Sequence, residues 1–169
     1  MGIFPSRILL AIGGCDDADL VTRKAVDLAE GIGCELYVVY VGQLPSFLMK
    51  NLDTIGFDLA LYEEIEREAL EMLWNLTCQV KVSGGTVAGA HLRMGSVAEE
   101  IVTLAKDLEA DLIVIGSRGH GGLRRMIEGS ISEHVVRHAY CPVMIVRADQ
   151  EEHRGFWRKI FSSGYAGFR

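Results

Sequence analysis

A glycine-rich segment carries the clearest chemical signal in the sequence. It reads Gly116-Ser-Arg-Gly-His-Gly-Gly-Leu-Arg-Arg-Met-Ile-Glu-Gly-Ser-Ile-Ser132, with the spacing G-x2-G-x9-G-S. Gly116 and Gly119 lack a Cβ, so the backbone can turn sharply and approach a ligand closely. Gly129 and Ser130 stand where a helix is expected to begin, and the unpaired N–H groups of a helix start favour an anion. The segment therefore predicts a site for the phosphates of a nucleotide.

Side chains of the same segment supply further donors and positive charge. Ser130 and Ser132 offer hydroxyl groups to phosphate oxygens, and the guanidinium fork of an arginine such as Arg118 matches phosphate geometry. The residues expected to contact the phosphates and ribose are Gly116, Ser117, Arg118, Gly119, His120, Gly129, Ser130, Ile131 and Ser132. A glycine-rich loop that binds nothing is the alternative, and the strand before the segment and the helix after it favour binding.

Five short apolar runs are expected to form the strands that position this segment. They are rich in β-branched residues and several are nearly continuous, which suits a parallel sheet covered on both faces. The expected strands are Arg7–Ile12, Cys34–Val41, Val87–Leu92, Asp111–Ile115 and Pro142–Arg147.

Apolar residues at helical spacing lie between these runs and predict four helices. The four stripes consist of Val21, Ala25, Leu28 and Ala29; Tyr62, Ile65, Ala69, Met72, Leu73 and Leu76; Val97, Ile101, Leu104, Ala105 and Leu108; and Ile131, Val135 and Ala139. Ser96 and Ser130, each followed by a glutamate three residues later, indicate capping boxes. Gly31 and Gly33 are expected to end the first helix.

The alternation of strands and helices predicts a single doubly wound, Rossmann-like α/β domain with a parallel sheet. Ligands of such sheets bind outside the carboxyl ends of the strands, where the strand order reverses. The loop after Ile12 is then expected to lie close to the loop after Ile115.

The segment GSRGHGGLRRMIEGSISEHVVRHAYCPVMIV, together with ILLAIGG, LYVVYV and HLRMGSVAEEIV, resembles the universal stress protein family over roughly residues 5–147. The resemblance implies the strand order 3-2-1-4-5 and a homodimer paired through the last strand, Pro142 to Arg147. It also implies that the glycine motif holds ATP or a related adenine nucleotide. Ala11, Ile12, Gly13 and Val41 would then frame the adenine.

One position departs from the family pattern. The first strand of the family commonly ends in Asp-Gly-Ser, whereas this chain has Gly13-Gly14-Cys15. The carboxylate that could hold a ribose hydroxyl is therefore missing from position 13, and Asp16 and Asp17 are the nearby candidates to replace it. A hydrogen bond of this kind contributes on the order of 1 kcal/mol, so we expect altered nucleoside selectivity and a retained phosphate site.

Composition limits the number of domains, the classes of partner and the expected location of the protein. The 169 residues suit one domain, and 17 basic against 23 acidic residues give a net charge of −6, which argues against nucleic acid as a partner. Cys15, Cys34, Cys78 and Cys141 form no C-x-x-C pair. Without an apolar leader or a run of membrane-spanning length, a reduced cytoplasm is the expected location.

No catalytic set stands out, so efficient catalysis is not expected. His134 and His138 are spaced as helical metal ligands can be, but no third ligand accompanies them. Phosphoryl transfer would need Mg²⁺, and Asp16, Asp17 or a loop hydroxyl could hold it. If ATP is hydrolysed, slow turnover is expected.

Three functions stay open at this point. The first is a regulatory module that binds ATP, and the second is an interaction protein with an empty pocket. The third is an ATP-pyrophosphatase, because Ile12-Gly-Gly-Cys-Asp-Asp17 partly matches the S-G-G-x-D-S loop of such enzymes. The later glycine motif favours the first.

Two segments depart from the rhythm of strands and helices. Gly42–Gly56 is long for a connection and carries several apolar residues, which suits a lid or a partner surface as well as a variable loop. Residues 148–169 follow the expected domain of 1–147 as a tail. Its aromatic and basic residues around Trp157 favour an amphipathic helix that docks on the domain or on a second subunit. A flexible tail is the alternative, and contact with a membrane also stays open.

Overall fold

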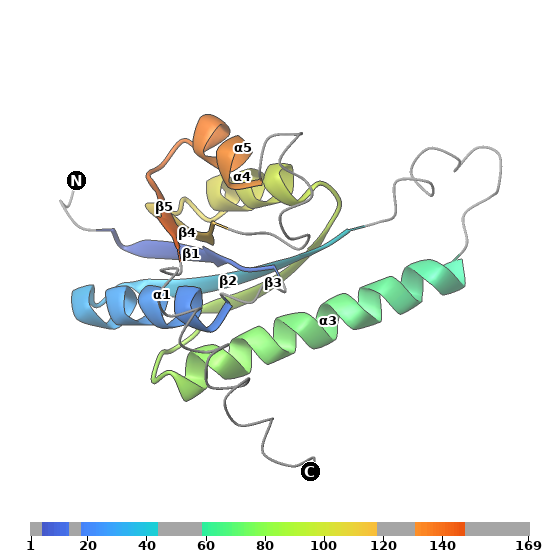
Figure 1. Cartoon of the computed structure of the whole chain (residues 1–169), viewed down its shortest axis with the longest axis horizontal. Coiled ribbons are helices and arrows are strands. Elements are labelled where there is room, and N and C mark those ends of the chain that lie inside the picture. Colours follow the sequence, from blue (N-terminus) through green and yellow to red (C-terminus); the bar gives the residue numbers. More distant parts are fainter. Residues whose placement is uncertain (1–4, 14–17, 44–58, 118–130, 148–169) are drawn as a thin grey trace, which may run out of the picture.

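A parallel sheet with helices on both faces forms the protein (Figure 1). The computed structural model describes residues 5–13, 18–43, 59–117 and 131–147. The strands are β1 (Arg7–Ala11), β2 (Glu35–Gly42), β3 (Gly89–Met94), β4 (Leu112–Gly116) and β5 (Val143–Val146). The helices are α1 (Ala18–Ile32), α3 (Leu59–Val82), α4 (Val97–Asp107) and α5 (Ile131–His138). The five strands are ordered β3-β2-β1-β4-β5, so the predicted fold class and strand order are confirmed.

The strand bounds differ from the predicted ones by one or two residues, most clearly at β3. The sequence predicted Val87–Leu92, but the strand is Gly89–Met94. Val87 packs against the core ahead of the strand, and the Ala88 N–H donates to the Leu36 carbonyl oxygen at 2.8 Å. The parallel register pairs Tyr37 with Gly89. The start of β3 is therefore set by its pairing with β2, and not by the position of the first apolar residue in the run.

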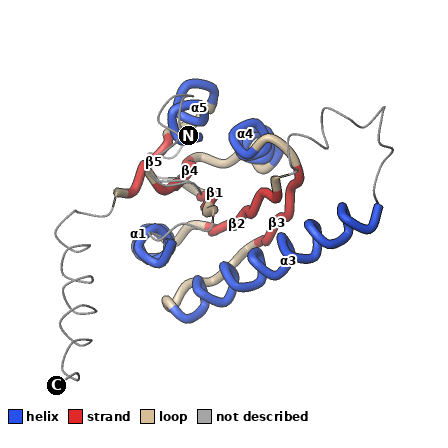
Figure 2. Tube along the Cα trace, turned by 45° about the vertical axis from the view of Figure 1, so that its right-hand side comes forward, coloured by secondary structure: helices blue, strands red, loops and turns tan. Residues whose placement is uncertain are grey.

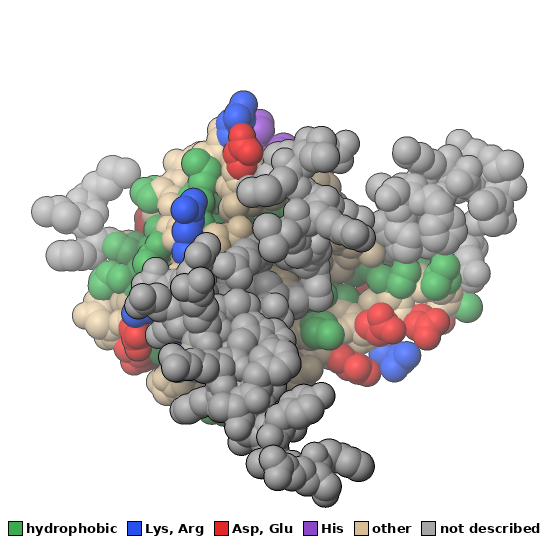
Figure 3. All heavy atoms as spheres, in the orientation of Figure 1, with side chains coloured by type: hydrophobic (Ala, Val, Ile, Leu, Met, Phe, Trp, Pro, Cys, Tyr) green, Lys and Arg blue, Asp and Glu red, His purple; other side chains and the backbone are tan. Residues whose placement is uncertain are grey.

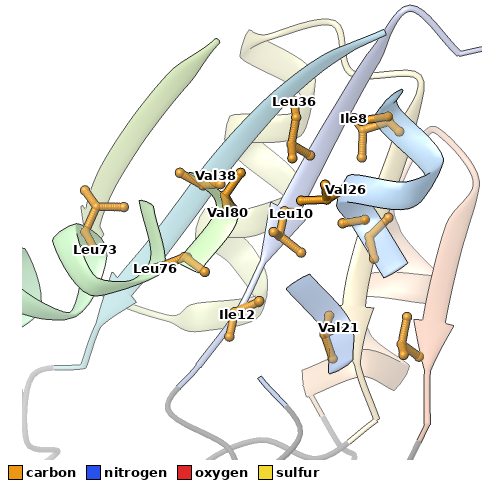
Figure 4. Packing of buried hydrophobic residues seen from close by; sticks show 14 residues of the cluster. Ile8, Leu10, Ile12, Val21, Val26, Leu36, Val38, Leu73, Leu76 and Val80 are labelled. Atoms are coloured by element: carbon orange, nitrogen blue, oxygen red, sulfur yellow. The ribbon is translucent and has the colours of Figure 1, made fainter. Parts of the chain in front are cut away.

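Alternation along the strands divides the core into two clusters, one on each face of the sheet. In β1, Ile8 and Leu10 point to the face covered by α1 and α3, and Leu9 and Ala11 point to the opposite face. Figure 4 shows the first cluster, in which Leu10 and Val38 meet residues of both helices. Because side chains alternate along a strand, the central strands bury residues on both sides and read as continuous apolar runs.

The helices form two outer layers, which Figure 2 shows nearly along the strands. Helices α1 and α3 pack together on one face, and α4 and α5 pack together on the other. Each helix buries part of its apolar stripe, with Val21 and Ala25 from α1 and Leu104 from α4 almost fully buried. The stripes that the sequence predicted for these layers therefore face the sheet.

Two predicted helix signals differ from the structure. Gly31 lies inside α1, and Gly33, with a φ of 77°, alone takes the left-handed conformation that ends the helix. The N–H groups of Gly33 and Cys34 both donate to the Ala29 carbonyl oxygen. Ser96 precedes α4 as its N-cap, but its side chain makes no capping hydrogen bond, so the capping box predicted there is wrong.

Helix α3 extends past the sheet, as Figures 1 and 2 both show. Its buried residues are Ala69, Leu73, Leu76 and Val80, all in the second half of the helix. The predicted stripe included Met72, whose side chain is instead 45% exposed. The first half of α3 therefore has little of the core to hold it.

Several predicted features fall outside the described residues. They are most of the Gly42–Gly56 connection, the capping box at Ser130, and the tail of residues 148–169. Among the helices that the structure does describe, none combines the length and apolar character that crossing a bilayer requires.

Candidate functional site

A cavity of about 400 Å³ opens at the carboxyl ends of β1, β2 and β4. Parallel strands end at the same edge of the sheet, and β1 pairs with β2 on one side and with β4 on the other. The chain reverses direction of winding at this position, since β2 precedes β4 along the chain and the two flank β1. Cavities at such switch points are the usual ligand sites of doubly wound sheets, and the volume suits a small molecule.

The wall of the cavity includes eight of the residues that the sequence singled out. They are Ala11, Ile12, Gly13, Val41, Gly116, Ser117, Ile131 and Ser132. The other five, Arg118, Gly119, His120, Gly129 and Ser130, lie outside the described residues. The structure thus brings together two groups of residues that are about a hundred positions apart in the sequence. That they bind a nucleotide stays a prediction.

The end of β1 forms the middle of the wall. Ala11 and Ile12 are buried on opposite faces of the sheet, with exposed fractions of 2% and 8%. Ala11 pairs with Val39 on one side and with Ile115 on the other, which fixes the strand end between its neighbours. Gly13 follows as an exposed residue, and a Cβ placed on it would meet no atom within 4 Å. Among the described residues, none occupies the space beside Gly13 at the cavity.

Helix α5 begins at the β4 side of the cavity. Ile131 and Ser132, the first two residues of the helix, line the wall, and Ser132 is 8% exposed. Val135 anchors the helix because it is completely buried in the core between α4 and the sheet. On the strand side, the Ser117 N–H donates to the Val146 carbonyl oxygen at 2.9 Å, which holds the end of β4 against β5. A helix start and two serine hydroxyls thus meet at this end of the cavity.

The opposite wall comes from α3 and the end of β2. Ile65, Glu68 and Met72 of α3 line it together with Tyr40 and Gln43. None of these five residues was predicted for the site, because Ile65 and Met72 were assigned to the core stripe and no pattern marks Glu68, Tyr40 or Gln43. Ile65 and Met72 thus belong both to the apolar stripe and to the cavity wall, and Glu68 lies within one helical turn of each of them.

Charge is distributed unevenly over the cavity wall. Among the described residues that line the cavity, Glu68 is the only one with a charged side chain. Tyr40 lies near it: burial, and secondly the negative charge of Glu68, raise the pKa of the Tyr40 phenol above its ordinary value. Tyr40 therefore stays a neutral hydrogen-bonding group at physiological pH.

A second hollow of about 300 Å³ adjoins the cavity toward the start of α4. It shares Gln43, Val97 and Ile131 with the cavity and adds Gly95, Ser96, Ala98 and His134. Ser96, whose hydroxyl makes no capping bond, thus faces this hollow. The site is therefore larger than the space between the three strand ends.

The described residues contain no group of three or more His, Cys, Asp and Glu side chains arranged to hold a metal ion. His134 and His138 stack with ring centroids 4.1 Å apart, and His138 Nδ1 lies 2.9 Å from the His134 carbonyl oxygen. The ring of His138 is thus bonded to its own helix. Burial chiefly raises the pKa of the Cys34 and Cys141 thiols, so neither is activated as a nucleophile.

Comparison with known proteins identifies the relationship. The sequence model of the universal stress protein family matches residues 5–147. The chain belongs to this family. Universal stress protein YxiE of Bacillus subtilis is 33% identical over 147 residues, which cover 84% of this chain and 99% of that protein. Universal stress protein MJ0531 of Methanocaldococcus jannaschii is 30% identical over 146 residues, which cover 86% of this chain and 84% of that protein.

A solved structure of a universal stress protein has a bound ligand. The protein, from Archaeoglobus fulgidus, was determined in complex with dAMP. It is 26% identical to this chain, with a TM-score of 0.60, and the match covers 86% of this chain and 98% of the other. The similarity in fold over most of both chains agrees with membership of the family.

Proposed function

We propose that this universal stress protein binds an adenine nucleotide, ATP in particular, and acts as a regulatory module. The observation that carries the proposal is the cavity at the switch point, lined by both halves of the predicted site. Binding would couple the glycine-rich segment, the end of β1 and helix α3, because all three meet at this cavity. Hydrolysis of ATP would be slow, since the described wall offers no nucleophile paired with a base.

The β4 side of the cavity suits the phosphates. The first N–H groups of α5 and the positive end of its dipole favour negative charge, and Ser117 and Ser132 lie on the same side. The glycine-rich residues that precede α5 in the chain would complete this end, with Arg118 contributing positive charge. ATP is proposed to bind there with or without Mg²⁺.

The strand ends suit the nucleoside. Ala11, Ile12 and Val41 present apolar surface at the centre of the cavity, which matches the faces of an adenine ring. The dAMP complex of the Archaeoglobus fulgidus protein supports the same class of ligand. Adenine nucleotides combine a flat apolar base with an anionic end, as the two parts of this cavity require.

We also propose a homodimer formed through β5. In the described part of the chain β5 pairs with β4 alone, so one of its edges offers free backbone groups. Tyr140 and Met144, at or near this edge, expose 55% and 37% of their surface. A second copy that pairs along this strand would cover such apolar surface.

The direct test is to identify what the full-length protein carries and binds. Mass spectrometry of the protein purified without dialysis should detect an adenine nucleotide. Calorimetric titration with ATP should give saturable binding, which Gly129→Val abolishes because its side chain blocks the approach of phosphate. The matched control is Gly31→Val, at an exposed position of α1 where an added Cβ meets no atom within 4 Å.

Other results would select other functions. Absence of any co-purified nucleotide together with no titration signal would favour an interaction protein with an empty pocket. Fast Mg²⁺-dependent release of pyrophosphate from ATP would favour the pyrophosphatase. Unchanged ATP affinity in Gly129→Val would remove the glycine-rich segment from the site.

A further inference from the structure

The wall of the cavity carries one carboxylate among the residues that the structure describes. Glu68 of α3 is the only charged side chain among the described lining residues, and its polar neighbours Tyr40 and Gln43 lie on the same side. Ser117 and Ser132 lie at the β4 side with the start of α5. The cavity thus has a negative end at α3 and an end that favours anions at α5.

This arrangement favours one direction of nucleotide binding over the other. A phosphate group beside Glu68 would be repelled by the carboxylate, whereas the start of α5 attracts it. Figure 3 shows that acidic side chains also gather on the outer surface formed by α3. These charges favour a pose with the phosphates toward α5 and the nucleoside toward α3.

An ionised carboxylate only accepts hydrogen bonds, so it selects groups that donate them. A nucleoside offers two kinds of donor, the hydroxyls of ribose and the exocyclic amino group of adenine. Tyr40, whose pKa is raised, keeps its proton and can share such a contact. Position 13, where the family commonly has an aspartate, holds a glycine, so the described end of β1 provides no carboxylate.

We propose that Glu68 is a specificity-determining residue that accepts a hydrogen bond from the nucleoside part of the ligand. The proposal rests on the proposed function and refines it. It makes the α3 carboxylate the counterpart of the acidic group that is absent from the end of β1. Ligands without a donor at this end, or with negative charge there, are discriminated against.

The test is titration of the full-length protein and its Glu68→Gln variant with ATP, dATP and ITP. Glutamine keeps the size and removes the charge, and because Glu68 is exposed, ATP affinity should fall about fivefold. The control is Glu64→Gln, which removes the same charge one helical turn away; Glu64 is exposed, as Glu68 is, but does not line the cavity. It should bind ATP as the unmodified protein does. Thermal melts of both variants verify that they are folded.

The two analogues identify the donor. If the contact is to ribose, the unmodified protein prefers ATP to dATP, and Glu68→Gln removes most of that preference. If the contact is to the amino group, the same holds for ATP against ITP, which has a carbonyl oxygen in place of the amino group. Either pattern supports the proposal.

Three outcomes would overturn it, and they are distinguishable. If the unmodified protein binds none of the three nucleotides, the proposed function and this inference fail together. If it binds ATP and Glu68→Gln binds equally well, only the inference fails. Tighter binding by Glu68→Gln would show that the carboxylate faces the phosphates, which reverses the proposed orientation.

Discussion

Gly13, at the end of β1, allows the clearest test of how the cavity is built. A Cβ added there meets no atom within 4 Å, and the residue does not need the left-handed conformation. Gly13→Ala should therefore fit without strain. Because alanine restricts the unfolded chain more than glycine does, we expect a gain of about 0.5 kcal/mol in the free energy of unfolding, or about 1–2 °C in Tm.

Gly42, at the end of β2, provides a matched contrast in the wall of the same cavity. A Cβ there would lie 2.6 Å from the Met94 Sδ atom and 3.0 Å from the Ala69 Cβ atom. The Met94 side chain can turn away, but Ala69 is fixed on α3. Gly42→Ala should therefore lower the free energy of unfolding by about 1–2 kcal/mol, with the opposite sign to Gly13→Ala.

Gly13→Asp extends the test from stability to binding. The fold accepts the side chain for the same reason, and the new carboxylate can accept a hydrogen bond from the nucleoside. Because the position is exposed, we expect a gain of only about 1 kcal/mol, or about fivefold in ATP affinity. The gain should be larger in the Glu68→Gln background, where the new carboxylate has no like charge at the other wall.

The assays are urea unfolding followed by circular dichroism for stability and calorimetric titration with ATP for binding. The reasoning would be refuted at the level of structure if Gly13→Ala lowered the midpoint as much as Gly42→Ala does. It would be refuted at the level of binding if Gly13→Asp weakened ATP binding both with and without Glu68→Gln. That result would place negative charge of the ligand beside β1.

Three further predictions concern stability. Gly85→Ala should cost about 1–3 kcal/mol in urea unfolding, because its Cβ would lie 2.8 Å and 2.9 Å from the two Cγ atoms of Val26; no loss would show that α1 can move away. Tyr140→Phe should cost about 1 kcal/mol in the same assay, because the phenol lies 2.6 Å and 2.9 Å from two carbonyl oxygens at the end of α4; an unchanged midpoint would mean that water replaces the bond. Burial, and secondly the charge of Arg93, lower the pKa of His91, so the unfolded chain binds more protons and stability should fall as the pH drops below about 6.5. Urea midpoints at pH 7.5 and 5.5 should differ less in His91→Phe than in the unmodified protein, and an equal difference would contradict this assignment.

The sequence was sufficient for the sheet because β-branched runs leave few alternatives. Three apolar runs of the central strands, with helical periods between them, already require a parallel sheet covered on both faces. Details that depend on rotamers were less accessible. Ser96 and Glu99 have the residue types of a capping box, but the pattern does not fix the direction of the Ser96 hydroxyl, which makes no capping bond.

The candidate site was predictable only in part, for a similar reason. Local sequence patterns predict binding sites that use the backbone, because glycines and helix caps occur at specific positions. Gly116 and the start of α5 at Ile131 are examples. No such pattern marks Glu68. Its place in the cavity depends on how α3 crosses the end of β2, and that crossing is set by packing between segments far apart in the chain.

The overhang of α3 gives the helix two differently anchored halves. From Ala69 onward the helix packs against the core, whereas residues 59–68 contribute no fully buried side chain. Helical segments with few buried contacts open and close far more often than the rest of a protein, and their amide protons exchange with solvent sooner. Ile65 and Glu68 belong to this loosely held half and also line the cavity, so a bound ligand would add contacts where the core adds almost none. Ligand binding in the cavity would thus make the exposed first half of α3 more rigid, a change that is accessible at the surface of the domain.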